Sequence, residues 1–437
     1  MNLYDIAYLL GGCLAAPAWL LRGASRKKVL GALKGRMGHI PPRTGSATGI
    51  LIHAVSLGEM NATRELVRRL RLARNEGQLH FIITTTTDTG FARGQELYGS
   101  QSDVTLVRFP LDFSWAVNRL LESLRPSVAV LMELEVWPNF LRQCRRAGIP
   151  VLIINGRLTE ASFSRYARIK PMARAMFRQV QAICAQDEIY AKRFIELGAD
   201  PAAVSVTGTM KFDTAEISEP VEAAQTLARA TSVSAGDGPI WLCASTGPGE
   251  EAIVLEQYRA LLARFPTLRL VIVPRHPQRF DEAAGLIATA GFPCLRRSRA
   301  AATPSPGIPG EVRRRVILGD TMGELRAWYS LADVVFVGRT LVDLGPRQHG
   351  SDMIEPAALA KPVVVGPFTG NFAEPMAKFL DADAMVEVNS PNELGKETAE
   401  LLQDTQRAAA LGRRAKQVVA SERGATDRHV NAILKLL

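Results

Sequence analysis

The stretch GILIHAVSLGE, residues 49–59, contains the pattern that decides the fold of this chain. Its apolar run ends at Val55, as expected of a short buried strand. Ser56 to Glu59 then form a turn, and a helical pattern follows from Ala62 to Arg74. A strand, a polar turn and a helix in this order are typical of a parallel α/β sheet, in which helices connect neighbouring strands.

The same alternation continues along the chain in two sets. The first set of predicted strands is Gly49–Val55, Phe81–Thr85, Val104–Val107, Val128–Met132, Val151–Asn155, Ala182–Ala185 and Val204–Thr207. The second set is Ile240–Ala244, Leu268–Val273, Val316–Gly319, Val334–Gly338, Pro362–Gly366 and Met385–Val388. We therefore predict two Rossmann-like domains, residues 46–213 and 239–437, joined by a linker over residues 214–238. In such sheets ligands bind beyond the carboxyl ends of the strands, so we expect a shared cleft.

The composition supports two ordinary globular domains. The chain has 437 residues, of which 47% are hydrophobic and 22% charged, which excludes a disordered or collagen-like protein. Its five cysteines are odd in number, far apart and never in a C-x-x-C pair, so we expect neither a disulfide framework nor a zinc site. A reducing compartment is consistent with this cysteine usage.

The first 45 residues differ from the rest. Leu3 to Leu21 carry a single charge, Asp5, and the bases Arg22, Arg26, Lys27, Lys28, Lys34, Arg36 and Arg43 follow. A cleaved signal peptide carries its bases before the apolar run, so we predict that residues 1–45 are a membrane-associated helix with a basic segment. The alternative is a buried N-terminal helix with a solvated basic turn. Because residues 1–43 hold +6 of the formal charge of +10, we predict a membrane surface rather than nucleic acid as partner.

Charged residues follow three strands of the first domain. Glu59 lies after the first strand, Glu133 and Glu135 lie after the fourth, and Lys211 lies after the seventh. Because the carboxyl ends of parallel strands share one edge, we expect three carboxylates and a cation to converge there. The alternative for Glu59 is a helix-start acid that the helix dipole stabilises.

The second domain carries groups suited to a nucleotide. Ser245, Thr246 and Glu251 lie where a strand turns into a helix, a place where backbone N–H groups can hold a phosphate. Arg275 and His276 follow the next strand, and Gly323 follows another. Glu355 opens a helix, where its carboxylate can bind the vicinal hydroxyls of a ribose.

These motifs resemble those of the Kdo transferases, which transfer 3-deoxy-D-manno-oct-2-ulosonic acid (Kdo). The resemblance covers nearly the whole chain. The motifs that carry it are HAVSLGE at His53–Glu59, TTTTDTG at Thr84–Gly90, ELEVWPN at Glu133–Asn139, NGRLTE at Asn155–Glu160, GTMKFD at Gly208–Asp213, PRHPQRF at Pro274–Phe280 and DTMGEL at Asp320–Leu325.

The resemblance implies a glycosyltransferase of the GT-B type. It implies inverting, metal-independent transfer of Kdo from CMP-Kdo, without a cofactor, to a hydroxyl of a lipid A precursor at the cytoplasmic face of the bacterial inner membrane. Glu59 would be the general base, and Glu133, Glu135 and Lys211 would complete the catalytic set. The implied donor-binding residues are Ser245, Thr246, Glu251, Pro274, Arg275, His276, Met322, Gly323, Glu324, Asp352, Glu355 and Asn371.

The chain departs from the family pattern in the second domain. Gly247 stands where the family usually has histidine, and Gly338-Arg339 stands where it has two glycines. The loop over residues 344–354 also differs, with Asp352 where an asparagine would contact the nucleotide. Two alternatives follow: a divergent GT-B paralogue that uses another nucleotide sugar, and a non-catalytic paralogue that binds lipid or nucleotide.

Overall fold

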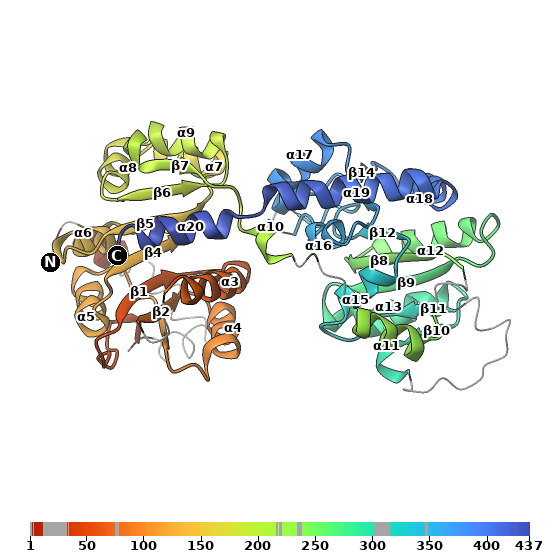
Figure 1. The fold of residues 1–437 in the computed structure, drawn as a ribbon, viewed down its shortest axis with the longest axis horizontal. Coiled ribbons are helices and arrows are strands. Elements are labelled where there is room, and N and C mark those ends of the chain that lie inside the picture. Colours follow the sequence, from red (N-terminus) through yellow and green to blue (C-terminus); the bar gives the residue numbers. More distant parts are fainter. Residues whose placement is uncertain are drawn as a thin grey trace. The chain divides into compact units, whose positions relative to one another are not determined.

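The computed structural model describes residues 2, 4–11, 33, 35–74, 78–215, 217, 221–233, 238–300, 315–345 and 348–437. The chain forms two compact units (Figure 1). The first unit consists of Met1–Thr214 with Arg423–Leu437, and the second of Ala215–Glu422. Most of the predicted apolar run Leu3–Leu21, and the bases from Arg22 to Lys28, lie outside the described residues.

The first unit is built on a seven-stranded parallel sheet in the order β3-β2-β1-β4-β5-β6-β7. Its strands are β1 (Thr48–His53), β2 (Leu79–Thr85), β3 (Val104–Arg108), β4 (Val128–Met132), β5 (Val151–Gly156), β6 (Ala182–Ala185) and β7 (Val204–Val206). Its helices are α3 (Leu57–Ala73), α4 (Asp88–Tyr98), α5 (Ser114–Leu124), α6 (Pro138–Arg146), α7 (Glu160–Ala167), α8 (Lys170–Phe177), α9 (Glu188–Glu196), η1 (Pro201–Ala203), α10 (Lys211–Thr214) and α20 (Ala425–Leu434).

Helices cover both faces of this sheet, and successive side chains of each strand point to opposite faces, so both sets of side chains are buried. Ile50 and Ile52 of β1 pack in the cluster that includes residues of α3 and α20. Leu51, between them, packs in the opposite cluster with residues of α5, α6 and α8. The chain reverses its winding direction between β1 and β4, so the carboxyl ends of these two strands are neighbours.

The second unit has a parallel sheet in the order β10-β11-β9-β8-β12-β13-β14. Its strands are β8 (Ile240–Thr246), β9 (Arg269–Pro274), β10 (Cys294–Arg296), β11 (Val316–Leu318), β12 (Val334–Val337), β13 (Val363–Val365) and β14 (Val386–Glu387). Its helices are α11 (Val221–Thr231), α12 (Glu250–Leu261), η2 (Pro277–Arg279), α13 (Phe280–Thr289), η3 (Arg297–Arg299), α15 (Leu325–Leu331), α16 (Ile354–Ala358), η4 (Gly370–Phe372), α17 (Ala373–Asp381), α18 (Pro391–Gln403) and α19 (Thr405–Glu422). The switch point lies between β8 and β12.

Two predicted boundaries are wrong. The domain predicted to run to residue 437 ends at Glu422, because α20 packs on the first unit through Val430 and Ile433 (Figure 1). The linker predicted over residues 214–238 contains α11, which packs against α15 of the second unit. Strand β10 was not predicted, because three half-buried residues give too short a pattern.

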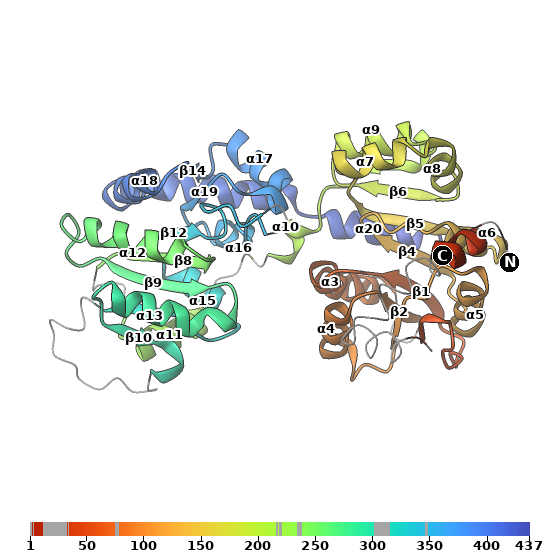
Figure 2. The same ribbon diagram turned by 180° about the vertical axis from the view of Figure 1, so that it is seen from behind.

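The start of the chain docks on the first unit. Residues 4–11 form a helix beside α6 (Figure 2). Asp5 is buried and accepts hydrogen bonds from the Ser114 N–H (2.7 Å) and the Ser114 hydroxyl (2.6 Å) at the start of α5. The same helix exposes Ile6, Leu9 and Leu10. Within the described ranges, no helix combines the length and the apolar character needed to cross a bilayer.

Candidate functional site

The first candidate site lies at the carboxyl ends of β1, β4 and β5 in the first unit. Glu59 is the third residue of α3, and its side chain is 9% exposed. One carboxylate oxygen accepts the Val55 N–H (2.9 Å) and the other accepts the Ser56 N–H (3.1 Å). The Ser56 hydroxyl in turn accepts the Glu59 N–H (3.1 Å), which completes a capping box. Each oxygen keeps a second lone pair for a substrate hydrogen bond.

Glu133 and Glu135 lie in the turn after β4. Glu133 has a φ of 57°, in the left-handed region that non-glycine residues rarely occupy. Its N–H donates to the Ile154 carbonyl of β5 (3.0 Å), which holds this turn in place. Glu135 accepts a hydrogen bond from the Trp137 indole N–H (3.2 Å). Trp137 is also the N-cap residue of α6, so the residue that binds Glu135 lies where the turn becomes a helix.

The electrostatics show that these side chains share one environment. Burial and the charge of Glu59 raise the pKa of Glu133, while Arg157 and Lys211 oppose the rise. Burial, and then Glu59 and Glu133, raise the pKa of Glu135 to about 7. The structure therefore brings the predicted carboxylates and the cation close together at the shared carboxyl edge of the sheet.

Asn155 and Arg157 belong to this site and were not singled out from the sequence. The Asn155 side-chain oxygen accepts the Met210 N–H (3.1 Å), which positions the residue before Lys211. The Asn155 N–H donates to the Nε2 atom of His429 on α20 (3.0 Å). Asn155 lies near the carboxyl end of β5 and Arg157 follows the strand, and both belong to the quoted NGRLTE motif, so the rule that ligands gather at strand ends could have identified them.

The second candidate site lies at the carboxyl ends of β8, β9 and β12 in the second unit. Ser245 (φ 55°) and Arg339 (φ 60°) both occupy left-handed backbone at the strand ends. Glu250 joins the two turns: its carboxylate accepts the N–H groups of Gly247 (2.8 Å), Arg339 (2.6 Å), Thr340 (3.0 Å) and Leu341 (2.9 Å). The phosphate-binding turn predicted here is thus braced from inside by a buried acid.

Glu251 differs from the sequence prediction. Its side chain is 0% exposed, and Arg279 donates to both of its oxygens (2.5 and 3.1 Å). The hydroxyl of Thr246, which is also fully buried, donates to Glu251 as well (2.8 Å). These two predicted donor contacts therefore hold the turn together from below rather than reach a ligand, because periodicity alone does not tell which side of a turn is covered.

Two arginines and a histidine lie close together at this edge. Arg275 and His276 are exposed after β9, which ends at the buried Pro274. Burial and then the charges of Arg275 and Arg339 lower the pKa of His276. Burial and the charge of Arg275 likewise lower the pKa of Arg339. Mutual repulsion of this kind is relieved by an anion, so this edge suits a phosphate.

The remaining predicted donor residues lie in three further turns of the second unit. Burial, followed by the charges of Glu355 and Asp352, raises the pKa of Tyr329, and the charge of Arg275 opposes this rise. Glu355, Asp352 and Arg275 therefore all lie near the Tyr329 side chain. The others are placed as follows: Met322 is 69% exposed, Gly323 has a φ of 85°, Glu324 accepts from Arg297 (2.8 Å), and the Asn371 N–H donates to the His349 carbonyl (3.1 Å).

Comparisons with known proteins agree with the resemblance. Residues 31–214 match the family model described as 3-deoxy-D-manno-octulosonic-acid transferase (kdotransferase). The 3-deoxy-D-manno-octulosonic acid transferase of Haemophilus influenzae is 36% identical over 87% of this chain and 85% of its own. This chain belongs to the Kdo transferase family. The Bordetella pertussis member is 34% identical over 89% of this chain and 87% of its own.

Solved structures of more distant proteins have a similar fold. A glycosyltransferase from Rickettsia africae has a TM-score of 0.58 at 13% identity, over 90% of this chain and 99% of its own. Anabaena Alr3699/HepE, solved with UDP and glucose, has a TM-score of 0.55 at 13% identity, over 89% of this chain and 100% of its own. At this identity the likeness concerns the architecture of two parallel-sheet α/β domains.

Two departures from the family pattern are neighbours in the structure. A Cβ atom added at Gly247 would meet the Arg339 side chain at 2.9 Å and the Leu344 side chain at 2.7 Å. A side chain at position 247 would therefore need the Leu344 and Arg339 side chains to move. The two departures are linked in this way, because the arginine at one turn occupies space that a side chain at the other would use.

Proposed function

We propose that this Kdo transferase family member transfers Kdo from CMP-Kdo to a hydroxyl of a lipid A precursor. The observation that carries the proposal is the cluster of Glu59, Glu133 and Glu135 with Lys211, in a chain 36% identical to a curated Kdo transferase. Carboxylates beside a cation suit an alcohol that must lose a proton while a negatively charged sugar is brought close.

In the proposed reaction Glu59 is the general base. It removes the proton of the acceptor hydroxyl as the oxygen attacks the anomeric carbon, and the bond to the phosphate breaks with its electron pair leaving on CMP. The sugar configuration inverts, because attack and departure occur on opposite faces. The backbone N–H groups of Val55 and Ser56 donate to the Glu59 carboxylate and fix its orientation. A general base positioned in this way contributes roughly 10²- to 10⁴-fold to the rate.

The cations divide between the two ends of the donor. Lys211 and Arg157, which oppose the raised pKa of Glu133, would neutralise the sugar carboxylate. Arg275, His276 and Arg339 would bind the phosphate of CMP, and Glu355 the ribose hydroxyls. A leaving group with one phosphate carries less charge than a diphosphate, so we propose that these side chains act without a metal or cofactor.

The proposed place of the reaction is the cytoplasmic face of the bacterial inner membrane, where a lipid acceptor is found. The exposed Ile6, Leu9 and Leu10 of the described N-terminal helix support contact with a lipid surface. Asp5 is bonded at the start of α5, so it presents no charge to that surface.

The test is release of CMP from purified protein supplied with a lipid A precursor and a panel of nucleotide sugars. CMP-Kdo should support turnover, and Glu59→Gln should lower it at least a hundredfold, as expected for loss of a general base. Because Glu59 also caps α3, the unfolding temperature of the variant is measured alongside. The exposed Glu188→Gln is the matched control and should keep full turnover.

Other outcomes separate the alternatives. Turnover only with a different nucleotide sugar would favour a changed donor. The residues that motivate this alternative are Asp352, Gly247 and Arg339, where the chain departs from the family pattern. No turnover with any donor, in protein that still binds the lipid, would favour a non-catalytic paralogue. Full activity of folded Glu59→Gln would remove Glu59 from the role of base.

A further inference from the structure

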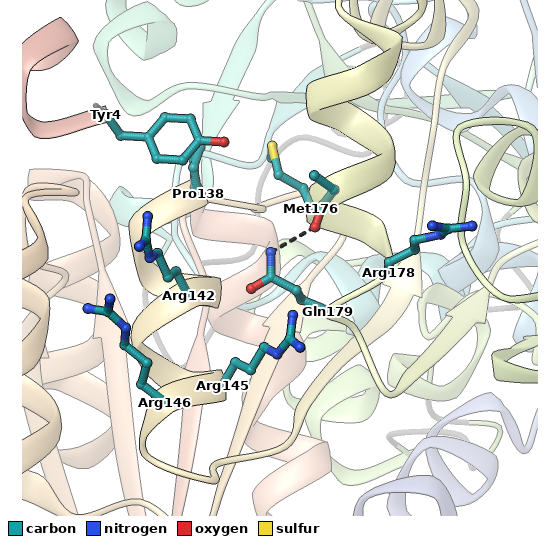
Figure 3. A pocket seen from close by; sticks show the side chains of 9 residues that line it. Tyr4, Pro138, Arg142, Arg145, Arg146, Met176, Arg178 and Gln179 are labelled. Atoms are coloured by element: carbon teal, nitrogen blue, oxygen red, sulfur yellow. Dashed lines mark hydrogen bonds between the residues drawn. The ribbon is translucent and has the colours of Figure 1, made fainter. Parts of the chain in front are cut away.

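A second charged site lies on the first unit, on α6 and α8. A pocket of about 640 Å³ is lined by Arg142, Arg145 and Arg146 of α6, by Arg178 at the end of α8, and by Tyr4 of the N-terminal helix. Figure 3 shows the three α6 arginines below Tyr4, with Gln179 beside Arg145. Among the described residues, no carboxylate lines this pocket. It therefore concentrates positive charge without an internal counter-ion.

The arginines of this pocket, which we call the arginine pocket, have no carboxylate partners in the described chain. All four are exposed, and no described residue forms an ion pair or side-chain hydrogen bond with them. The dipole of α6 accounts for bases in its last turn, Arg145 and Arg146, but not for Arg142 in the middle of the helix. The neighbouring pocket that shares Arg178 is different, because Glu196 and Asp200 also line it.

The segment that supplies the four arginines of this pocket is unusually basic for the chain. Residues 138–178 contain nine bases and one acid, Glu160, which is a net +8 in a chain of +10. Glu160 does not offset these bases, because it is paired with Arg193 of α9. Concentrated positive charge of this kind attracts a surface of phosphates.

The pocket adjoins an apolar surface. Tyr4 is both a wall of the pocket and the start of the helix that exposes Ile6, Leu9 and Leu10. Leu10 follows Tyr4 by six residues, or about 9 Å along a helix. Apolar side chains beside unpaired bases match a bilayer, where acyl chains lie just below anionic headgroups. A nucleic acid would offer phosphates but no apolar layer.

We propose that the arginine pocket binds the phosphate of an anionic lipid headgroup, while the adjoining apolar side chains of residues 4–11 contact the acyl layer. The inference deepens the proposed placement at a membrane surface and rests on it. It assigns the contact to folded residues of the first unit, in addition to the basic segment predicted within residues 1–45.

The test compares binding of the full chain to two kinds of vesicle, phosphatidylcholine alone and phosphatidylcholine mixed equally with phosphatidylglycerol. Arg142→Gln/Arg146→Gln should lower partitioning onto the anionic vesicles about thirtyfold and leave binding to phosphatidylcholine unchanged. Arg64→Gln/Arg74→Gln removes two exposed arginines elsewhere on the same unit and is the charge-matched control. Arg142→Lys/Arg146→Lys should retain most of the binding, because the charge is kept.

Four results would overturn the proposal. One is equal loss of binding in the test and control variants, which would indicate net charge alone. A second is unchanged partitioning of Arg142→Gln/Arg146→Gln with an unchanged unfolding temperature. A third is displacement from vesicles by millimolar inorganic phosphate, which would indicate a site for free phosphate. A fourth is that Arg142→Gln/Arg146→Gln loses binding to a single-stranded oligonucleotide while its binding to vesicles is unchanged. Glu59→Gln should bind vesicles normally, so failure of the transfer reaction is distinguishable.

Discussion

Replacing Glu135 by glutamine is expected to stabilise the first unit at alkaline pH. Burial beside Glu59 and Glu133 raises the pKa of this carboxyl from its ordinary 4.5 to about 7. Glutamine has nearly the same shape, and its side-chain oxygen can still accept the hydrogen bond from Trp137. The substitution therefore removes the unfavourable charge and keeps the local geometry.

The magnitude follows from the difference between the two pKa values. It corresponds to about 3 kcal/mol, an upper value because the side chain is only half-buried. The folded pKa lies above the unfolded one, so between pH 4.5 and 7 the folded chain keeps a proton that the unfolded chain has released. The stability of the folded chain therefore falls as pH rises through that window. Above pH 7 the full cost of holding the charged Glu135 carboxylate in the folded chain is present.

The assay is scanning calorimetry at pH 5 and pH 9, with hydrogen exchange of peptides from β4 and α6 to assign the transition. At about 2 to 4 °C per kcal/mol, the variant should unfold about 6 to 12 °C above the unaltered chain at pH 9 and near it at pH 5. The exposed Glu188→Gln should follow the unaltered chain at both values. A constant offset between Glu135→Gln and the unaltered chain from pH 5 to pH 9 would refute the reasoning.

Two further predictions concern buried acids with structural roles. Asp213 accepts the N–H groups of Gly424 (2.7 Å) and Thr426 (2.5 Å) at the start of α20, so Asp213→Ala should destabilise that helix by about 1 to 2 kcal/mol and speed its hydrogen exchange. Unchanged exchange in residues 425–434 would contradict this. Glu251→Ala removes one of the two carboxylates that bind the buried Arg279, while Glu282 keeps its ion pair with it, and should cost about 1 to 3 kcal/mol in urea unfolding, against less than about 0.5 kcal/mol for the exposed Glu256→Ala. Equal losses in the two variants would mean that the pair is not structural.

The strands of both sheets were readable from sequence because each is a short run of apolar residues between polar turns. Val128–Met132 and Ala182–Ala185 were predicted with the bounds they have, since burial on both faces makes such runs continuous. The return of α20 to the first unit was not readable. Its amphipathic pattern fits a helix on any sheet, and only the cap from Asp213 and packing of Val430 fix its place.

Charge was the quantity that sequence reasoning misjudged. The sum over the residues after position 43 is small, and this small value conceals a net +8 over residues 138–178. The arginines of α6 are separated in sequence from Arg178 by a strand and two helices, so only folding gathers these four bases around one pocket.

The sequence by itself determined the two parallel sheets, the family and the acids that follow β1 and β4, because these depend on local pattern and on the order of motifs. Tertiary structure alone decided which acids gather in the candidate site and which only brace a turn. Glu59 and Glu251 both lie in the first turn of a helix after a strand, yet the first adjoins other carboxylates and the second is sealed against Arg279. The reason is that burial and partner charge depend on residues distant in the chain, which no local pattern records.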